Sequence, residues 1–395
     1  MITKSALYSI ISLIYVTAFL PVLAHAQLAR QDWGKVAGEH RIHPKAEFME
    51  GLPMGPFAIL PNGDLIAPED SDDASHVLVS RDNGKTWKKN PVFADPDKFR
   101  ISYERAITCT REGTVILSFM NLVERADWAW DPKLHDSPKA KLPNYVVRSP
   151  DGGRTWEAPQ KMHDDWTGAI RDMIQLKDGS IVFTSQMLLH NPGRHAVVTY
   201  GSRDQGQTWK RSNILDLGGI GHHDGAIEAS LVERKDESLL MLMRTNWGRL
   251  WQADSLDRGK TWRPIGPTNL DASAAPPILE RLESGRIFIA WNRYYWSGTE
   301  DYPAAGGDLQ WSGTRTSNNR QELSIAFSED DGKTWTEPEV IATVIPNKDG
   351  TYPRKQVCYP YVFERRPGEI WLTVWRFGGF RVKLMEDDFV GRDGQ

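Results

Sequence analysis

One eight-residue pattern, Ser-x-Asp-x-Gly-x-Thr-Trp, occurs five times in this chain and constrains its fold more than any other feature. The copies span Ser80–Trp87, Ser149–Trp156, Ser202–Trp209, Ser255–Trp262 and Ser328–Trp335, so their starts lie 69, 53, 53 and 73 residues apart. Asp and Gly favour a tight turn, because the Asp side chain bonds nearby backbone groups and Gly accepts a positive φ. The pattern therefore predicts a repeat protein in which each copy is a hairpin between two outer strands of a small sheet.

A second repeated element, two apolar strands joined by a turn, precedes each octapeptide. It occurs six times, in the ranges 55–67, 104–119, 169–185, 226–244, 275–292 and 358–376. Six four-stranded sheets around one axis make a six-bladed β-propeller, so we expect an all-β fold with five octapeptide hairpins. We expect residues 27–50 to give a strand that closes the ring with the last unit. An open β solenoid or two smaller β domains are the alternatives.

The N-terminus carries the features of a secretory signal peptide. Lys4 precedes an apolar run from Ala6 to Ala24, and Ala24-His25-Ala26 is typical of a cleavage site. We therefore predict that residues 1–26 are removed, that residues 27–395 form one propeller domain, and that the protein is exported to the periplasm or secreted. A membrane anchor is the alternative for the same run. No other run is apolar enough to span a bilayer, so no membrane association is expected after cleavage.

Composition argues against several classes of function. The formal net charge is −4, and removing Lys4 leaves 47 basic against 52 acidic residues, which disfavours nucleic-acid binding. No Cys-x-x-Cys or His-x-x-x-His spacing indicates a metal, and no glycine-rich phosphate loop is convincing, so neither a metal nor a cofactor is expected. The two cysteines, Cys109 and Cys358, could form one disulfide or remain two buried thiols.

Two connections are longer than a blade needs, from Asn121 to Asn144 and from Asn292 to Gln321. Long loops in a compact fold are usually functional or disordered. The second connection holds five aromatic residues: Tyr294, Tyr295, Trp296, Tyr302 and Trp311. This content favours an ordered rim on which sugar rings could stack, with Trp296 as a candidate substrate-binding residue.

Aligning the six units on their turns brings distant residues to equivalent places on the innermost strand. Those places hold Gly55, Arg105, Arg171, Glu228 and Tyr359, with Pro276 or Pro277 in the fifth unit. We therefore expect two arginines, a carboxylate and a phenol to converge at one mouth of the central channel. Such groups could simply neutralise one another around water, since buried charge must be paired. Clustered arginines instead favour an anionic ligand, because the guanidinium fork suits carboxylates.

The octapeptides resemble the Asp-box, or BNR, repeats of the sialidase superfamily, and the resemblance covers about residues 50–395. It implies a sialidase-like propeller and an exo-acting glycosidase that binds the carboxylate of sialic acid with three arginines. It also implies a Tyr nucleophile activated by a Glu, with an Asp as acid/base. This mechanism is an exception to the two-carboxylate scheme of most glycosidases.

The resemblance carries over to particular residues. Glu228 and Arg244, 16 residues later, resemble the family's Glu and second arginine, and Tyr359 resembles the nucleophile. Arg320 lies where the third arginine would fall, and Arg293 is its rival. The pairing of Tyr359 with Glu228 is chemically sound, because a phenol has a pKa of about 10 and a neighbouring carboxylate can take its proton as it attacks.

The first unit departs from the family. The family has Arg-Ile-Pro at this place, whereas this chain has Gly55-Pro56 after Met54, so the first carboxylate-binding arginine is missing. Arg105 or Arg171 could substitute for it from neighbouring blades, or Arg41 from the preceding segment.

Acidic and histidine residues flank two of the inner strands. The acid/base is expected just after the second strand of unit one, where the candidates are Asp70, Asp72 and Asp73. An acidic surface loop is the alternative for each. His222, His223 and Asp224 precede the Glu228 strand, and they could line the same mouth or serve at the surface.

The leading hypothesis is an exported sialidase-type hydrolase that removes a terminal acidic sugar from a glycan with retention, sialic acid being favoured. Tyr359 would attack the anomeric carbon, Glu228 would act as its base, and one of the Asp70–Asp73 carboxylates would protonate the leaving oxygen. A hydrolase or lyase of the same fold on another acidic glycan is one alternative, supported by the missing arginine. A non-catalytic carbohydrate-binding propeller is another, although a binding module would need neither Glu228 nor Tyr359.

Overall fold

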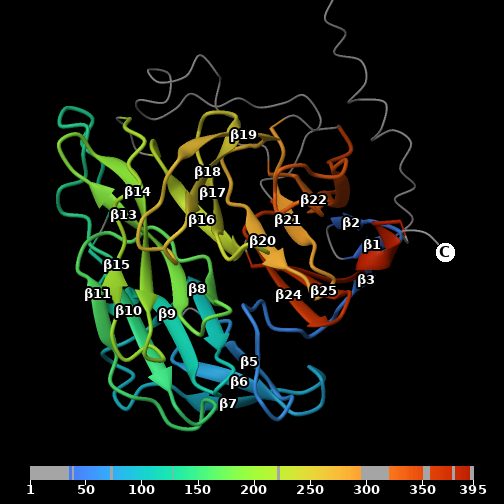
Figure 1. The fold of residues 1–395 in the computed structure, drawn as a ribbon, viewed down its shortest axis with the longest axis horizontal. Coiled ribbons are helices and arrows are strands. Elements are labelled where there is room, and N and C mark those ends of the chain that lie inside the picture. The colour runs from blue at the N-terminus through green and yellow to red at the C-terminus, as the bar shows by residue number, and fades with distance from the viewer. Residues whose placement is uncertain are drawn as a thin grey trace, which may run out of the picture. The chain divides into compact units, whose positions relative to one another are not determined.

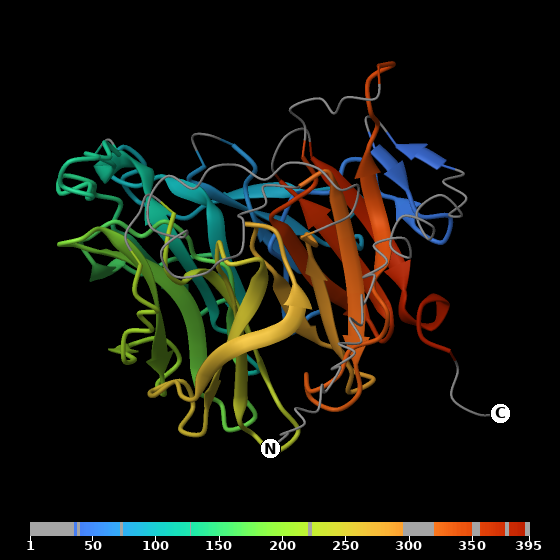
Figure 2. The ribbon, with the colours of Figure 1, turned by 90° about the horizontal axis from the view of Figure 1, so that it is seen from above.

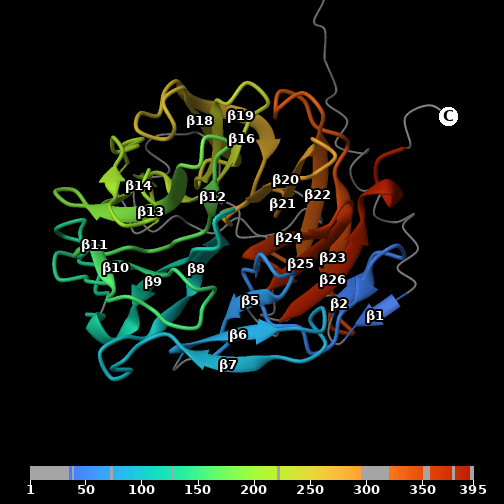
Figure 3. The same ribbon diagram turned by 60° about the horizontal axis from the view of Figure 1, so that its bottom comes forward.

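Each repeated unit of the sequence folds into one antiparallel sheet, and the six sheets follow one another around a common axis as a six-bladed β-propeller (Figures 1 and 3). This computed structural model describes residues 35–37, 40–71, 74–126, 128–219, 223–294, 320–349, 356–375 and 379–391. The described strands all belong to one unit, Trp33–Gln395. The predicted all-β fold and six-bladed propeller are confirmed.

The first four blades use four consecutive strands each. Blade one contains β4 (Ala58–Ile59), β5 (Leu65–Pro68), β6 (His76–Ser80) and β7 (Lys88–Pro91). Blade two contains β8 (Ile101–Cys109), β9 (Val115–Asn121), β10 (Asn144–Ser149) and β11 (Gln160–His163). Blade three contains β12 (Met173–Gln175), β13 (Ile181–Leu189), β14 (Arg194–Ser202) and β15 (Lys210–Arg211). Blade four contains β16 (Ile227–Glu233), β17 (Leu239–Arg244), β18 (Arg249–Ser255) and β19 (Ile265–Asp271).

The last two blades borrow strands from the N-terminal segment. Blade five contains β20 (Ile278–Arg281), β21 (Ile287–Trp291), β22 (Glu322–Ser328) and β23 (Glu339–Val344), extended by β2 (His40–Ile42) and β1 (Lys35–Ala37). Blade six contains β24 (Pro360–Arg366), β25 (Glu369–Val374) and β26 (Phe380–Met385), completed by β3 (Glu47–Phe48). Figure 2 shows these blue N-terminal strands beside the orange and red strands. The predicted closing strand is therefore confirmed in β3, whereas the extension of blade five was not foreseen.

The first strands of the six blades surround the axis. In Figure 3, β8, β12 and β24 lie near the centre of the ring, while β7 and β11 lie at its periphery. These first strands line a central cavity of about 680 Å³, which reaches Arg171 and Tyr361. Short 3-10 turns, η1 (Leu122–Glu124) and η2 (Glu386–Asp388), follow β9 and β26.

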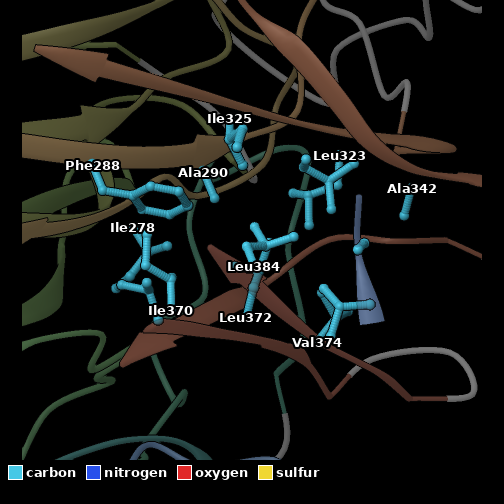
Figure 4. Close-up of a cluster of buried hydrophobic side chains, with 14 of the residues drawn as sticks. Ile278, Phe288, Ala290, Leu323, Ile325, Ala342, Ile370, Leu372, Val374 and Leu384 are labelled. Atoms are coloured by element: carbon cyan, nitrogen blue, oxygen red, sulfur yellow. The ribbon is translucent and has the colours of Figure 1, made fainter. Parts of the chain in front are cut away.

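Apolar side chains between neighbouring sheets hold the blades together. Figure 4 shows the cluster between blades five and six, where Ile278, Phe288, Ala290, Leu323 and Ile325 lie opposite Ile370, Leu372, Val374 and Leu384. The spacing of two within each strand places these side chains on one face of their sheet. Their burial keeps the blades in a fixed arrangement and so positions the loops at the axis.

The octapeptides form the hairpins between the third and fourth strands of blades one to five, as predicted. In the fifth copy, Ser328 Oγ donates to Asp330 Oδ1 (2.9 Å) and accepts from Gly332 N (2.8 Å). Asp330 also accepts from Thr334 N (2.8 Å) and Thr334 Oγ1 (2.7 Å). Gly332 has a φ of +86°, which a side chain would strain. The recurring Ser, Asp, Gly and Thr of the repeat are therefore explained by one hydrogen-bonded turn.

We expect Asp330→Ala to lower the free energy of unfolding by about 0.5–1.5 kcal/mol at pH 7, because it removes the acceptor of the solvent-exposed hydrogen bonds of the turn. The backbone N–H and hydroxyl of Thr334 lower the pKa of Asp330 to about 2. The folded-state pKa lies below the unfolded one, so this contribution is complete above about pH 4 and is lost as the pH falls towards 2. Calorimetry at pH 7 and pH 2.5 should therefore show the variant's deficit shrinking in acid. Lys333→Ala, at an exposed position in the same hairpin, is the control; a deficit of equal size at both pH values would contradict the prediction.

Several predictions fall on residues outside the described ranges. These are the signal peptide (1–26), Asp72, Asp73, His222 and the aromatic residues of the long blade-five connection other than Tyr294. Both cysteines are free thiols, so of the two alternatives the structure has the unpaired one, and burial raises the pKa of Cys109 to about 11. Among the described residues no helix has the length and apolar character to cross a membrane.

Candidate functional site

Five polar side chains from four blades gather at one end of the axis. Glu228 lies at the start of β16, Arg244 at the end of β17, Tyr359 just before β24, and Arg171 and Arg320 just before β12 and β22. Each of the five is at most 7% exposed. Burial of so many ionisable groups requires that they bond one another or a ligand.

Tyr359 and Glu228 are in direct contact across the axis. The hydroxyl of Tyr359 donates a hydrogen bond of 2.9 Å to Glu228 Oε1, although 131 residues separate the two. A base can take a proton directly when its acceptor atom lies about 2.6–3.2 Å from the atom that carries the proton. The predicted partnership of phenol and carboxylate is therefore present in the folded chain.

Arg244 forms hydrogen bonds with both Glu228 and Tyr359. Its Nη1 donates to Glu228 Oε2 (2.6 Å) and to the Tyr359 oxygen (3.2 Å). Burial opposes ionisation of Glu228, but the charge and hydrogen bond of Arg244, with further help from Arg171 and Arg320, hold its pKa below the ordinary value. Burial raises the pKa of Tyr359, as does the charge of Glu228, against the opposing charges of Arg244 and Arg320. The resting state is thus a neutral phenol hydrogen-bonded to an ionised carboxylate.

The local backbone conformation orients the side chains of both Glu228 and Tyr359. In the pairing of β16 with β17, Ile227 faces Arg244 and Ala229 faces Met243, so Glu228 is the extra residue of a β-bulge. Bulges redirect a side chain and recur next to active sites. Tyr359 has a φ of +64°, a left-handed conformation that is costly for an aromatic residue, by about 1–3 kcal/mol. Strain of this kind persists only where surrounding packing enforces it, here with Ala275, Cys358 and Trp375.

Arg171 and Arg320 lie against the ring of Tyr359. Their guanidinium carbons are 5.6 Å and 5.5 Å from the ring centroid, within the range of cation–π attraction. Arg171 also lies 4.8 Å from the centroid of Tyr361 and donates through Nη2 to Pro360 O (2.5 Å). Nε and Nη1 of Arg171, and Nε of Arg320, have no hydrogen-bond partner in the described part of the chain. Buried donors of this kind favour an anionic ligand that would satisfy them.

Arg105 has a different environment from the other arginines. It donates to Gly55 O through Nε (3.3 Å) and Nη2 (3.0 Å), to Glu69 O (2.7 Å) and Pro68 O (3.1 Å), and to Asp70 Oδ1 (2.9 Å). Its fork is therefore occupied by blade one and joins that blade to blade two. Of the two neighbouring-blade substitutes predicted for the missing arginine, Arg171 has nitrogens without a partner among the described residues, whereas every guanidinium nitrogen of Arg105 has one.

Asp70 is held on both carboxylate oxygens. Oδ1 accepts from Arg105 (2.9 Å), Oδ2 accepts from Met54 N (2.6 Å), and Arg381 Nη2 lies 4.0 Å from Oδ2. Burial raises the pKa of Asp70, against the opposing charges of Arg105 and Arg381. A raised pKa suits a proton donor, but both oxygens are engaged, one by Arg105 of blade two and the other by the backbone N–H of Met54. The structure does not describe its rivals Asp72 and Asp73.

Three other predicted residues serve different contacts. Arg293 Nε lies 3.6 Å from Asp271 Oδ1, at the end of β19 rather than against Tyr359. Asp224 Oδ1 accepts from Gly225 N (2.9 Å) and Trp247 Nε1 (3.1 Å), which shapes the turn before β16. His223 is exposed, and its ring centroid lies 6.0 Å from that of His195.

Two residues that were not predicted from the sequence, Tyr361 and Gln186, contact the site from inner positions. Tyr361, two residues after Tyr359, donates to Tyr103 O (2.8 Å) and lies under Arg171. The alternation of a strand could have indicated it, since residues two apart share a face. Gln186 on β13 contacts the backbone of Glu228 (3.2 Å), and no local pattern marks it. The described residues contain no group of three or more potential metal ligands.

The fold and this cluster define a six-bladed propeller with an arginine-rich polar site at its axis. Residues 94–372 match the family described as BNR repeat-like domain, and residues 78–89 match the BNR/Asp-box repeat. The first match covers more than half of the chain. The chain therefore belongs to the BNR repeat-like domain family, within the sialidase superfamily.

Curated relatives are sialidases of low identity. The chain is 25% identical over 238 residues to the sialidase of Paraclostridium sordellii (53% of this chain, 56% of that protein) and 29% identical over 222 residues to that of Bacteroides fragilis (54% and 37%). It is 24% identical over 351 residues to the sialidase of Micromonospora viridifaciens (77% and 50%). The matched regions thus span between 37% and 56% of the length of these relatives.

Solved structures share the fold. A protein of unknown function from Dyadobacter fermentans has a TM-score of 0.56 at 16% identity, covering 87% of this chain and 100% of that one. A Hadza microbial sialidase has the same TM-score and identity, covering 86% and 66%. Structural similarity at identities this low establishes the fold alone and carries no conclusion about activity.

Proposed function

We propose that this protein is a retaining exo-glycosidase of sialidase type that removes a terminal acidic sugar, with sialic acid as the favoured substrate. The observation that carries the proposal is the 2.9 Å hydrogen bond from the Tyr359 hydroxyl to Glu228, surrounded by Arg171, Arg244 and Arg320. A phenol whose proton already points at an ionised carboxylate is prepared for nucleophilic attack.

The chemistry proceeds in two displacements at the anomeric carbon. In the first, Glu228 takes the proton of Tyr359 while the phenol oxygen bonds to the anomeric carbon. The bond to the leaving glycan oxygen breaks, and that oxygen takes a proton from an acid in the Asp70–Asp73 segment. In the second, water adds to the anomeric carbon, its proton passes to the same carboxylate, and the carbon–phenol bond breaks as Tyr359 recovers its proton from Glu228. Two inversions leave the configuration of the sugar retained.

The arginines support a carboxylated substrate. Arg171 and Arg320 offer buried N–H groups without partners, and a sugar carboxylate would satisfy them with charge-assisted hydrogen bonds. We assign to Arg171 the role that the missing blade-one arginine has in the family, because Arg105 is already engaged by the carbonyl oxygens of Gly55, Pro68 and Glu69.

Assay of the purified protein on a fluorogenic α-sialoside tests this proposal. We expect turnover between about pH 4 and 8, with proton NMR detecting first the anomer that has the configuration of the substrate. The uncharged analogue, in which the sugar carboxylate is reduced to an alcohol, is the control and should not be cleaved. First release of the opposite anomer, or equal cleavage of the uncharged analogue, would contradict the proposal.

One observation favours a second candidate, a hydrolase or lyase on another acidic glycan. Gly55 stands where the family has the first of its three arginines. The carboxylate of a substrate would therefore meet arginines arranged differently from those of the family. Turnover of uronides in place of sialosides would support this candidate, and an unsaturated product absorbing in the ultraviolet would identify a lyase. A non-catalytic binding propeller is disfavoured, since binding alone requires no base on the Tyr359 hydroxyl.

We also propose that the protein is exported, to the periplasm or outside the cell. The proposal rests on Lys4, the apolar run that follows it and Ala24-His25-Ala26. N-terminal sequencing of the protein from its host should begin at Gln27; a sequence that starts at Met1 would contradict cleavage.

A further inference from the structure

The bulge that carries Glu228 leaves one backbone group to be accounted for. Since Ile227 pairs with Arg244 and Ala229 with Met243, the N–H of Glu228 falls outside the regular β16–β17 pairing. A buried backbone N–H without an acceptor is costly, and nearly all find one. The acceptor here is the side chain of Gln186, whose Oε1 lies 3.2 Å from Glu228 N.

The orientation of the Gln186 amide follows from its second contact. Nε2 lies 2.7 Å from Nδ1 of His195, so the amide donates to the ring and accepts from Glu228. A flipped amide would set donor against donor at Glu228. The network therefore assigns Nδ1 of His195 as an acceptor, and a single orientation of the Gln186 amide bonds both neighbours.

Packing leaves this amide little freedom. Gln186 is 2% exposed, and its backbone N–H bonds Ala169 O (3.2 Å). A Cβ added at Gly168 would lie 2.3 Å from Gln186 Nε2. Gly168 has no positive φ, so the requirement for glycine there is one of space. Blade three thus presents a fixed acceptor to the bulge of blade four.

We propose that Gln186 is a positioning residue for Glu228: its side-chain carbonyl holds the bulged N–H of Glu228 and thereby fixes the Glu228 carboxylate against the Tyr359 hydroxyl. This inference rests on the proposed function, in which Glu228 is the base. Gln186 does not touch the reacting atoms, and its contribution is geometric. Small displacements of a catalytic group reduce the rate steeply, by about 100-fold for 1 Å.

Two substitutions displace the amide by different routes. Gln186→Met removes the acceptor and keeps the length of the side chain. Gly168→Ala pushes the far end of a flexible side chain and leaves Gln186 itself intact. We expect each to lower kcat by roughly 10- to 100-fold on the cleaved acidic glycoside, with KM changed less than about threefold. Gly266→Ala, at a position where a Cβ meets no atom within 4 Å, is the matched control and should retain full activity.

Gln186→Glu separates positioning from packing. A protonated Glu mimics the amide, accepting from Glu228 N and donating to His195, so kcat should be near wild type in acid. Loss of the proton shared by residue 186 and His195 removes the bond between these two side chains and places a negative charge beside Glu228, while the carboxylate still accepts from Glu228 N. We therefore expect kcat to fall as the pH rises, because residue 186 loses its anchor on His195 and the added charge acts on Glu228. Among the described residues, the other titratable or charged groups near the network fall into two sets. Arg244, Tyr359, Arg171 and Arg320 surround Glu228, and His223 and Asp224 lie in the segment before β16. They are unchanged in the variant, so comparison with the wild-type profile isolates residue 186.

Amide hydrogen exchange of Glu228 provides a readout that does not depend on turnover. We expect its exchange to be faster in Gln186→Met than in wild type. Unchanged kcat together with unchanged exchange in Gln186→Met would overturn the inference, as would a loss of kcat in Gln186→Glu that is equal at all pH values. If wild-type protein cleaves no acidic glycoside, the proposed function fails; faster exchange in the variant would then still support the contact between Gln186 and the bulge, and unchanged exchange would refute it.

Discussion

Tyr359→Phe should reduce turnover by roughly 1,000-fold or more, the scale seen when a nucleophile is removed from a catalytic unit. The substitution deletes one oxygen, which bonds Glu228 at 2.9 Å and Arg244 at 3.2 Å. The Phe ring can keep its contacts with the two flanking arginines, at 5.6 Å and 5.5 Å. Substrate affinity should therefore change by less than about tenfold. Initial rates and calorimetric binding of the same sugar distinguish the two effects.

Tyr361→Phe is the matched control. It removes the same atom two residues along the same inner strand, beneath the same arginine, whose guanidinium lies 4.8 Å from the Tyr361 ring. The Tyr361 hydroxyl bonds only backbone in the described structure, donating to Tyr103 O (2.8 Å) and accepting from Arg105 N (3.2 Å). We expect about 1–3 kcal/mol of lost stability and turnover within a few-fold of wild type. Equal loss of turnover in both variants would refute the nucleophile assignment.

The contact between Tyr359 and Glu228 was predictable because it follows from the repeat. The octapeptides set the register of six similar units, and equivalent positions on inner strands must face the same axis. Arg171 was reached by the same symmetry. Arg244 and Arg320 could be identified only through the resemblance to a known family. Arg244 lies on the second strand of blade four and Arg320 lies just before the third strand of blade five, so an alignment of innermost strands includes neither.

What the sequence could not predict depends on contacts between blades. Arg105 occupies an equivalent place to Arg171, yet its fork is taken up by carbonyls of blade one, including that of Gly55. Which carbonyls face a guanidinium depends on how two sheets pack, and side-chain identity does not reveal it. The strands β1 and β2 have three residues each, too few for a periodic pattern, so their pairing with blade five had no signal.

Arg244→Met should impair both turnover and stability, because Arg244 bonds both Glu228 and Tyr359. Removal leaves Glu228, 5% exposed, without its 2.6 Å ion pair. Breaking a buried pair from one side costs about 3–5 kcal/mol. The pKa of Glu228 should rise, so the base is protonated over a wider pH range and cannot take the Tyr359 proton. We expect roughly a 1,000-fold loss of turnover. Urea unfolding and initial rates at several pH values measure the two losses.

The pH dependence and a double variant test whether the uncompensated charge is the cause. If Glu228 in Arg244→Met has a folded-state pKa above its unfolded one, the variant's deficit is small below about pH 4 and grows as the pH rises through the folded value. Arg244→Met/Glu228→Gln removes that charge, so it should recover stability at neutral pH and lose the extra pH dependence. It should remain inactive, because Gln cannot accept the proton of Tyr359. A double variant as unstable as Arg244→Met at pH 7 would mean that the packing of the Arg244 stem, and not its ion pair, stabilises the site.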